Sequence, residues 1–262
     1  MLMLAIRSAR FGGWKNPARF AIIVALVGGV NATSILLVGL SPIVWLVYAA
    51  STKEVSKKAA TSAALRIGAL SGVVSVWWLA GLYVEGKYGI NILKYTETIP
   101  TVSSTSSSSE VFRGLGYWYF YGRDAASLWI TPSSAYTSNH LTTFASYVVP
   151  ILGVIAALVV RWRYRLFAVL TAFLGVLIAV GTYPYASPSP FGSALKWFGE
   201  NTTLGLAMRS TNRVAPIMIL SLCLLVGAGF DALRRRQPDR PDRCGRRNQA
   251  PGAAGKGGCR DR

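Results

Sequence analysis

The stretch FAIIVALVGGVNATSILLVGLSPIVWLVYAAST (residues 20–52) has 33 consecutive residues without a charged side chain. Similar uncharged runs occupy residues 67–84, 141–160, 166–195 and 214–230. A bilayer core requires about 17–25 apolar residues for each helical crossing, whereas a soluble domain can bury its core without uncharged runs of this length. The chain is therefore predicted to be an all-α integral membrane protein that crosses the bilayer several times.

The first uncharged run is too long for one ordinary crossing. A single helix over its 33 residues would be about 50 Å long, whereas the hydrocarbon core is about 30 Å thick. Arg19 precedes the run and Lys53 follows it, so both ends are expected on the same side of the membrane. Two glycines and an asparagine at residues 28–31 weaken a helix and favour a turn. We therefore expect a hairpin over residues 20–52, and one long tilted helix is the alternative.

Basic clusters predict the orientation of the other segments. Lys53–Arg66, Arg161–Arg165 and Arg234–Arg236 each border an apolar run. Clusters of this kind favour the cytoplasmic side. The expected spans are residues 67–84, 141–160, 166–182 and 214–233, and the outer loops are residues 85–143 and 183–213. The chain is thus predicted to be a multi-pass plasma-membrane protein with long extracytoplasmic loops.

The net charge of +18 is unevenly distributed along the chain. Residues 234–262 contain ten Lys or Arg and three Asp, so this tail carries +7, and it shows no hydrophobic periodicity. Its composition predicts a disordered basic tail, either in contact with anionic lipid or read out of frame. The remaining +11 of the +18 lies at the ends of apolar runs, which fits membrane lipids as partners and excludes nucleic acid.

The sequence offers no pattern for a metal site. Its three cysteines and one histidine form no CxxC or Cys/His spacing. No metal ligands and no cofactor are identified, and a requirement for a divalent metal is left open.

Carboxylates are scarce outside the tail, and four of the seven lie in the first outer loop: Glu85, Glu97, Glu110 and Asp124. A carboxylate can act as general base for a sugar hydroxyl when it is held at the reacting atom. Each one taken singly is more simply a solvated or salt-bridged loop residue. Glu97 is the preferred exception, because in KYTETIP it closely follows Lys94 and Tyr95.

The first outer loop also contains two stretches of unusual composition. TVSSTSSSS (residues 101–109) has the composition of a flexible linker. YWYFY (residues 117–121) places five aromatic residues in a row. This second stretch suits either an interfacial aromatic belt or a platform for sugar or lipid, formed by Tyr117 and Trp118.

Arginines in the second outer loop are candidates for phosphate binding. Arg209 and Arg213 are four residues apart, which predicts that they share one helical face. Guanidinium groups can grip a lipid phosphate with two parallel hydrogen bonds, and ordinary interfacial anchoring is the alternative.

Several strings resemble the mycobacterial and actinobacterial alpha-(1→3)-arabinofuranosyltransferases, which are large GT-C-type membrane glycosyltransferases of cell-wall assembly. The strings are GGVNA (residues 28–32), WWLAGLYVEGKYG (77–89), SSTSSSSEVFRGLGYW (103–118), GTYPYASPSPFGSALKWF (181–198) and LAMRSTNRVAPIM (206–218). The resemblance covers about residues 1–233 and does not extend into the tail.

The resemblance implies a partial GT-C-type multi-helix bundle whose outer loops shape a cavity. The implied donor is decaprenyl-phosphoryl arabinose, and the implied acceptors are the arabinan chains of arabinogalactan and lipoarabinomannan, which would receive alpha-1,3 branches. For the donor that the resemblance implies, the phosphate or sugar would be contacted by Lys87, Arg113, Arg209 and Arg213. Tyr117 and Trp118 would line the lipid or sugar path, with Glu97 as an acidic helper.

The chain departs from the family pattern at one important point. GT-C enzymes usually carry the catalytic acid in the first extracytoplasmic loop, and this chain is expected to start beyond that loop, as a fragment. The main catalytic carboxylate would then lie upstream of Met1, and no catalytic residue is assigned. A membrane transporter or lipid flippase built on broken helices, and a truncated inactive product, remain alternative interpretations.

Overall fold

The computed structural model describes residues 1–28 and 32–236, and all of its regular elements in that part of the chain are helices. The first group is α1 (Leu2–Phe11), α2 (Lys15–Gly28), α3 (Ala32–Val38), α4 (Leu40–Ser51) and α5 (Lys57–Tyr88). The first loop contains η1 (Ile92–Lys94), α6 (Ile99–Ser103), α7 (Ser108–Phe112), α8 (Trp118–Tyr121) and α9 (Ser133–Thr137). The rest is α10 (His140–Val159), α11 (Arg165–Val180), α12 (Pro190–Asn201), α13 (Thr203–Ala207), η2 (Thr211–Val214) and α14 (Ala215–Arg236).

The all-α prediction is confirmed for the described residues. Three helical segments are long and apolar enough to cross a bilayer: Lys57–Tyr88, His140–Val159 and Thr211–Arg235. Two shorter apolar helices, Ile35–Ser51 and Arg165–Val180, accompany them. The expected spans 67–84, 141–160 and 166–182 therefore fall largely on α5, α10 and α11, and the span 214–233 falls on the end of η2 and α14.

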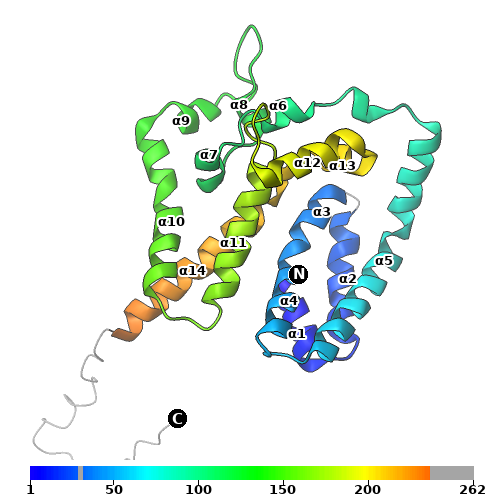
Figure 1. The fold of residues 1–262 in the computed structure, drawn as a ribbon, viewed down its shortest axis with the longest axis vertical. Coiled ribbons are helices and arrows are strands. Elements are labelled where there is room, and N and C mark those ends of the chain that lie inside the picture. The colour runs from blue at the N-terminus through cyan, green and yellow to red at the C-terminus, as the bar shows by residue number, and fades with distance from the viewer. Residues whose placement is uncertain (29–31, 237–262) are drawn as a thin grey trace, which may run out of the picture.

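Helices α2 and α3 run side by side in opposite directions (Figure 1), as in a hairpin. The residues expected to form the turn, 29–31, lie outside the described part of the chain, as does the tail from residue 237 onward. A Cβ added to Gly28 would lie 3.0 Å from Trp78 Nε1 and 3.3 Å from Ile35 Cδ1. A glycine at this position therefore lets α2 approach both α5 and the returning helix closely.

The helices form two groups (Figure 1), one built on α1–α5 and one on α10, α11 and α14, which meet at one end through α3 and η2 and at the other through α4 and the start of α11. In the first group, Trp45 is 2% exposed and packs with Ala49 and Ala63, and Phe167 of α11 belongs to the same buried cluster. In the second group, α11 packs against α14, where a Cβ on Gly175 would lie only 2.9 Å from Met218 Cβ. The absence of a side chain at residue 175 thus permits the close packing of these two helices.

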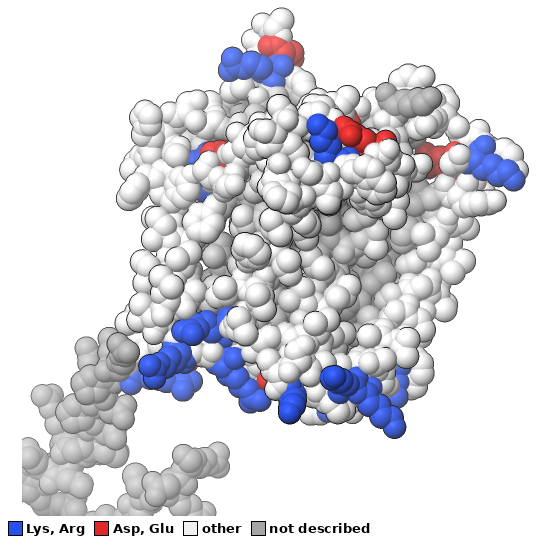
Figure 2. Space-filling model, in the orientation of Figure 1, with Lys and Arg blue, Asp and Glu red and all other residues white. Residues whose placement is uncertain are grey.

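The two ends of the helical body differ in charge. Figure 2 shows Lys and Arg gathered at the end that holds the α4–α5 and α10–α11 connections. We call this the basic end, defined by Arg10, Lys57, Arg161 and Arg165. The opposite end, which we call the loop end, holds residues 89–139 and 181–214. The assignment of the basic end to the cytoplasm stays a prediction.

The serine-rich stretch at residues 101–109 is not an open linker. It contains the end of α6 and the beginning of α7, and Ser103 and Ser106 are only 5% and 2% exposed. The side chain of Ser107 caps α7 by accepting a hydrogen bond from the Glu110 backbone N–H at 3.3 Å. Val111 on α7 is fully buried in a cluster with residues of α11 and α14. The linker expectation is wrong for this stretch, because parts of it are helical and several of its hydroxyl groups donate to nearby backbone carbonyls.

Candidate functional site

The candidate site is a cavity of about 270 Å³ at the loop end, below the point where the two outer loops meet. Helices α3, α4, α6, α11, α12 and α13 all contribute to its wall. Most of the lining side chains are apolar: Leu36, Leu37, Leu40, Ile99, Ile178, Phe191, Leu195, Phe198 and Met208. The polar lining residues are Thr182, Arg209 and Thr211. The cavity is therefore an apolar space with a small polar region that includes one arginine.

Two features of the second loop shape this cavity. Ser189 caps α12 by accepting a hydrogen bond from the Gly192 backbone N–H at 3.1 Å, and Pro190 occupies the first turn, where no donor is needed. A Cβ on Gly199 would lie 2.9 Å from Ile99 Cδ1, so a glycine here allows α12 to approach α6 closely. The first and second loops are thereby brought into direct contact.

Arg209 and Glu97 form the charged part of the site. Arg209 donates through Nε to the backbone carbonyl of Glu97 at 2.7 Å and through Nη1 to the carbonyl of Leu206 at 2.8 Å. Its Nη2 lies 3.4 Å from Glu97 Oε1 and also donates to Thr96 Oγ1. The side chain of Arg209 is 6% exposed and that of Glu97 is 19% exposed. Arg209 thus holds the Glu97 segment in place while lining the cavity.

The carboxylate of Glu97 has one occupied and one available oxygen. Ser210 Oγ donates to Oε1 at 3.3 Å, beside the Arg209 contact. Oε2 has no hydrogen-bond partner among the described residues. Ser210, which the sequence pattern did not single out, is 6% exposed and lies next to Arg209 in the chain. The arrangement leaves one carboxylate oxygen able to accept a proton or a hydrogen bond from a hydroxyl group.

The prediction that Arg209 and Arg213 share a helical face is wrong. Helix α13 ends at Ala207, and Arg213 lies on the separate 3₁₀ helix η2. Arg213 Nη1 donates to Thr33 Oγ1 on α3 at 3.0 Å, whereas Arg209 reaches toward Glu97. A spacing of four residues implies a common face only within one continuous α-helix, and the helix is interrupted at residues 208–210. The two arginines therefore reach different segments of the loop end.

The aromatic stretch is linked to the arginine segment through Gly116. The carbonyl of Gly116 accepts hydrogen bonds from Thr105 Oγ1 at 3.0 Å, Ser106 Oγ at 3.1 Å and Asn212 Nδ2 at 3.4 Å. Gly116 has φ +98°, a backbone conformation that glycine adopts far more readily than other residues. Asn212 is 6% exposed, and its Oδ1 has no hydrogen-bond partner among the described residues. The sequence analysis missed this asparagine because an isolated polar residue shows no local pattern.

Tyr117 and Trp118 follow directly after Gly116. Tyr117 is 41% exposed, while the indole of Trp118 stands edge-on to Trp129 with ring centroids 5.8 Å apart. Trp118 Nε1 is buried and has no hydrogen-bond partner within the described part of the chain. The pair therefore combines an accessible phenol with an indole packed into an aromatic cluster.

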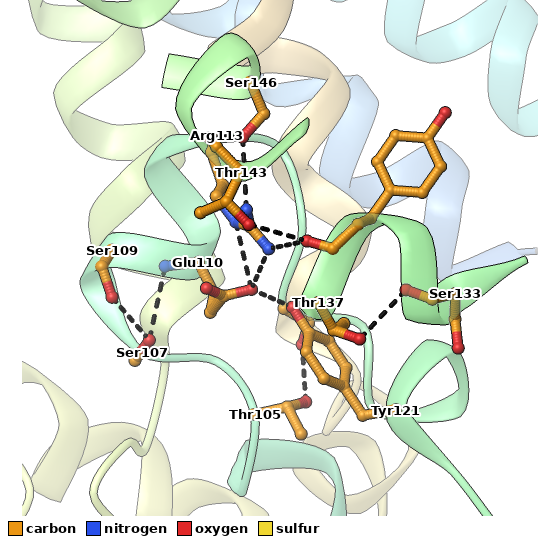
Figure 3. Close-up of polar contacts among 12 residues, drawn as sticks. Thr105, Ser107, Ser109, Glu110, Arg113, Tyr121, Ser133, Thr137, Thr143 and Ser146 are labelled. Atoms are coloured by element: carbon orange, nitrogen blue, oxygen red, sulfur yellow. Dashed lines mark hydrogen bonds and ion pairs between the residues drawn. The ribbon is translucent and has the colours of Figure 1, made fainter. Parts of the chain in front are cut away.

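Arg113 belongs to a second polar network, shown in Figure 3. Its Nε and Nη2 both donate to Glu110 Oε2, at 3.2 and 3.1 Å, and its Nη1 donates to Ser146 Oγ on α10 at 3.3 Å. Nη2 also donates to the Tyr136 carbonyl at 2.6 Å, and the side chain is 2% exposed. Arg113 is thus engaged in tying the first loop to α10, and it does not line the cavity.

Tyr121 completes this second network by donating its hydroxyl to Glu110 Oε2. Burial, followed by the hydrogen bond to the Glu110 carboxylate, raises the pKa of the Tyr121 phenol well above its usual range. Tyr121 therefore stays protonated and serves as a donor.

Lys87 lies apart from the cavity. It occupies the last turn of α5, where its side chain is exposed and Nζ lies 5.3 Å from the ring centroid of Tyr88. It is not among the residues that line the cavity. Of the sequence-predicted residues, only Arg209 lines the cavity; Glu97 is ion-paired with it, and Arg213 lies on the adjoining helix η2.

No group of three or more His, Cys, Asp or Glu side chains that could hold a metal ion occurs within residues 1–28 and 32–236.

Comparison with known families yields one match. The family described as alpha-(1→3)-arabinofuranosyltransferase, N-terminal GT-C domain, matches residues 1–255. No curated protein and no solved structure matches the chain. The matched region includes every element that contributes to the cavity, from α3 to η2.

Proposed function

The chain belongs to the family of alpha-(1→3)-arabinofuranosyltransferase N-terminal GT-C domains, and we propose that its loop-end cavity receives a polyprenyl-phosphate-linked pentose donor. As a member of this family with three apolar helices of spanning length, it is an all-α membrane protein and a glycosyltransferase domain. The proposed reaction transfers arabinofuranose from decaprenyl-phosphoryl arabinose to arabinan of arabinogalactan or lipoarabinomannan. The proposed product carries alpha-1,3 branches, and the loop end faces the extracytoplasmic side.

The observation that carries this proposal is the composition of the cavity wall. Nine apolar side chains surround it, and Arg209 and Thr211 form part of its polar region. A polyprenyl phosphate has the same two parts, because a long apolar chain ends in a charged phosphate. An apolar wall favours the isoprenoid carbons, and an arginine near the polar region favours the phosphate.

The charged groups suit a displacement at the anomeric carbon. The acceptor hydroxyl attacks that carbon, the new glycosidic C–O bond forms, and the bond to the phosphate oxygen breaks. The proton of the hydroxyl passes to a carboxylate, and polyprenyl phosphate leaves with the bonding electron pair. In this proposal Glu97, which is held by the cavity-lining Arg209, accepts a hydrogen bond from a sugar hydroxyl through Oε2, while Arg209 and Arg213 offset the charge on the leaving phosphate.

A pair of leucine substitutions in the second loop tests the proposed donor site. Leu195 lines the cavity, whereas Leu204 is 58% exposed and does not. Leu195→Trp narrows the apolar space and should raise the KM for a polyprenyl-phosphoryl arabinose donor about tenfold, the scale of one misplaced apolar group in a pocket. Leu204→Trp should leave this KM unchanged.

The measurement uses membranes that contain the enzyme and follows both sugar transfer and release of polyprenyl phosphate. An equal KM in both leucine variants would show that the cavity is not the donor site. Movement of the lipid without bond cleavage would favour the transporter interpretation instead. Unchanged donor turnover in Arg209→Ala and Arg213→Ala would show that these two residues do not bind the donor phosphate.

A further inference from the structure

We propose that a groove at the basic end, between α10, α11 and α14, binds one acyl chain of an anionic phospholipid whose phosphate sits on Arg165. This site is separate from the loop-end cavity and does not depend on the proposed donor. Its occupant is a lipid of the leaflet that borders the basic end.

The groove has a volume of about 790 Å³ and an almost entirely apolar lining. Ala157 on α10 and Ala172 on α11 leave room between the two helices, and Leu222 and Leu225 of α14 form its buried base at 5% and 3% exposed. Small side chains between larger ones leave a channel, which an acyl chain fills with favourable dispersion contacts.

The length of the groove corresponds to one leaflet. Its lining on α11 extends from Arg165 to Val176, which is about 16 Å at a rise of 1.5 Å per residue. Half of a hydrocarbon core is about 15 Å thick. A single acyl chain that starts at the basic end therefore fills the groove.

The short helix α7 closes the groove on the loop side. Its Phe112 contributes to the lining. The α7 region is tied to α10 because Arg113 Nη1 donates to Ser146 Oγ at 3.3 Å and Tyr147 hydroxyl donates to the Ser109 carbonyl at 3.3 Å. A transmembrane helix would have to pass this obstruction to pack along the whole length of α10, whereas an acyl chain ends below it. This geometry favours a lipid over a helix of a second copy.

Charge at the open end favours an anionic headgroup. Arg165 begins α11 and is exposed, and its guanidinium group has no hydrogen-bond or ion-pair partner among the described residues. Its neighbour Arg163 is instead paired with Glu54, at 3.2 Å between Nη2 and Oε2. Tyr164 occupies the N-cap position of α11 without a side-chain capping hydrogen bond, and the positive end of the α11 dipole also lies in this region. A phosphate at this position contacts the guanidinium group of Arg165 and the positive end of the α11 dipole.

The test compares two phospholipids with identical acyl chains on the whole protein in detergent. Phosphatidylglycerol and phosphatidylcholine are titrated, and bound lipid is counted by native mass spectrometry. Phosphatidylglycerol should bind more tightly, and Arg165→Ala should weaken it about fivefold, equivalent to about 1 kcal/mol, the usual contribution of one basic residue near anionic lipid. Arg7→Ala removes an exposed arginine of α1, outside the groove, and should have no effect.

A second pair of variants tests the acyl-chain part. Ala172→Phe fills the groove and should reduce binding of both lipids, whereas Leu170→Phe on the same helix, outside the lining, should not. Equal binding of both lipids to the unaltered protein, or equal effects of Arg165→Ala and Arg7→Ala, would overturn the proposal. A dimer that excludes lipid, and that Ala172→Phe dissociates, would assign the groove to a second copy of the chain and overturn it as well.

Discussion

Two carboxylates held by arginines, Glu54 at the basic end and Glu97 at the loop end, have similar chemistry and different surroundings. Glu54 is ion-paired with Arg10 and Arg163 and accepts a hydrogen bond from the Tyr164 hydroxyl at 2.8 Å. The side chains of its two arginines are 38% and 70% exposed. Glu97 has a single arginine partner, which is 6% exposed and lines a cavity.

The difference lies in which oxygen atoms remain available. At Glu54, Oε1 is contacted by Arg10 and Tyr164, and Oε2 by Arg163, so both oxygens are used in joining α1 to the two interhelical connections. At Glu97 both the arginine and Ser210 contact Oε1, which leaves Oε2 without a partner in the described part of the chain. A carboxylate suited to a ligand is therefore distinguished by an unused oxygen and by an arginine partner that lines a cavity, whereas the number of its ion pairs does not distinguish it.

Glu97→Gln should have the largest effect. If the carboxylate assists the acceptor hydroxyl, its loss slows sugar transfer about a hundredfold or more, the lower range for a general acid or base. The free energy of unfolding should also fall, because Arg209, which is 6% exposed, loses its counter-charge, although glutamine keeps an oxygen for Ser210 and Arg209 keeps its bonds to two backbone carbonyls. Initial rates with saturating donor measure the effect. Glu85→Gln, which alters an exposed carboxylate of the same loop, is the control, and equal rates in both variants would place Glu97 with Glu54 as a structural residue.

Glu110→Gln should have the next largest effect, and this effect is on the stability of the protein. The substitution leaves the guanidinium of Arg113, which is 2% exposed, without its counter-charge. Removing one partner of a buried pair typically costs about 3 kcal/mol. The melting temperature of the purified protein in detergent measures this cost. A melting temperature equal to that of the unaltered protein would mean that Arg113 is compensated by Ser146 and the Tyr136 carbonyl alone.

Glu54→Gln should destabilise the protein less. Arg10 and Arg163 both reach solvent and can be hydrated once the carboxylate is lost, so the cost is about 1 kcal/mol. The transfer rate should stay unchanged, in contrast to Glu97→Gln. Thermal unfolding and initial rates measured on the same preparation separate the two positions. A large loss of rate at unchanged stability would contradict the structural role of Glu54.

The stabilising effect of Glu54 should also depend on pH. Burial acts to raise the pKa of this carboxyl, but hydrogen bonds from Tyr164 and Arg10 and the charge of Arg163 outweigh it, so the pKa lies below its ordinary value. Its contribution is therefore present above the unfolded-state pKa of about 4.3 and lost as the pH falls through the lower folded-state pKa. The melting-temperature difference between the unaltered protein and Glu54→Gln should shrink below about pH 4. A difference that grows with acidification would contradict this sign.

The helical spans were predictable because hydropathy is a local property. The uncharged run at residues 141–160 and α10 differ by one residue at each end, and the run at 67–84 lies inside α5. The internal structure of the outer loops was less predictable from the sequence. The composition of residues 101–109 predicted a linker. In the structure a hydroxyl group of this stretch caps α7 and two others donate to the Gly116 carbonyl, and composition alone does not reveal these contacts.

The candidate site was predictable in part. Glu97, Arg209 and Arg213 were selected from residue type, and the structure brings the first two together. The supporting residues Ser210 and Asn212 were missed, and a shared helical face for the two arginines was wrongly expected, because one short break between α13 and η2 separates them.

The sequence by itself determined that this protein is all-α, apolar over several spans, and a member of an arabinofuranosyltransferase family, because these properties depend on local composition and on long matching strings. Only the tertiary structure decided which carboxylate is paired with an arginine that lines a cavity. Arg209 and the Glu97 carbonyl that it contacts are 112 residues apart, and both lie in loops whose paths depend on how α6 and α12 pack together. Contacts over such separations arise from packing and leave no periodic pattern in the chain.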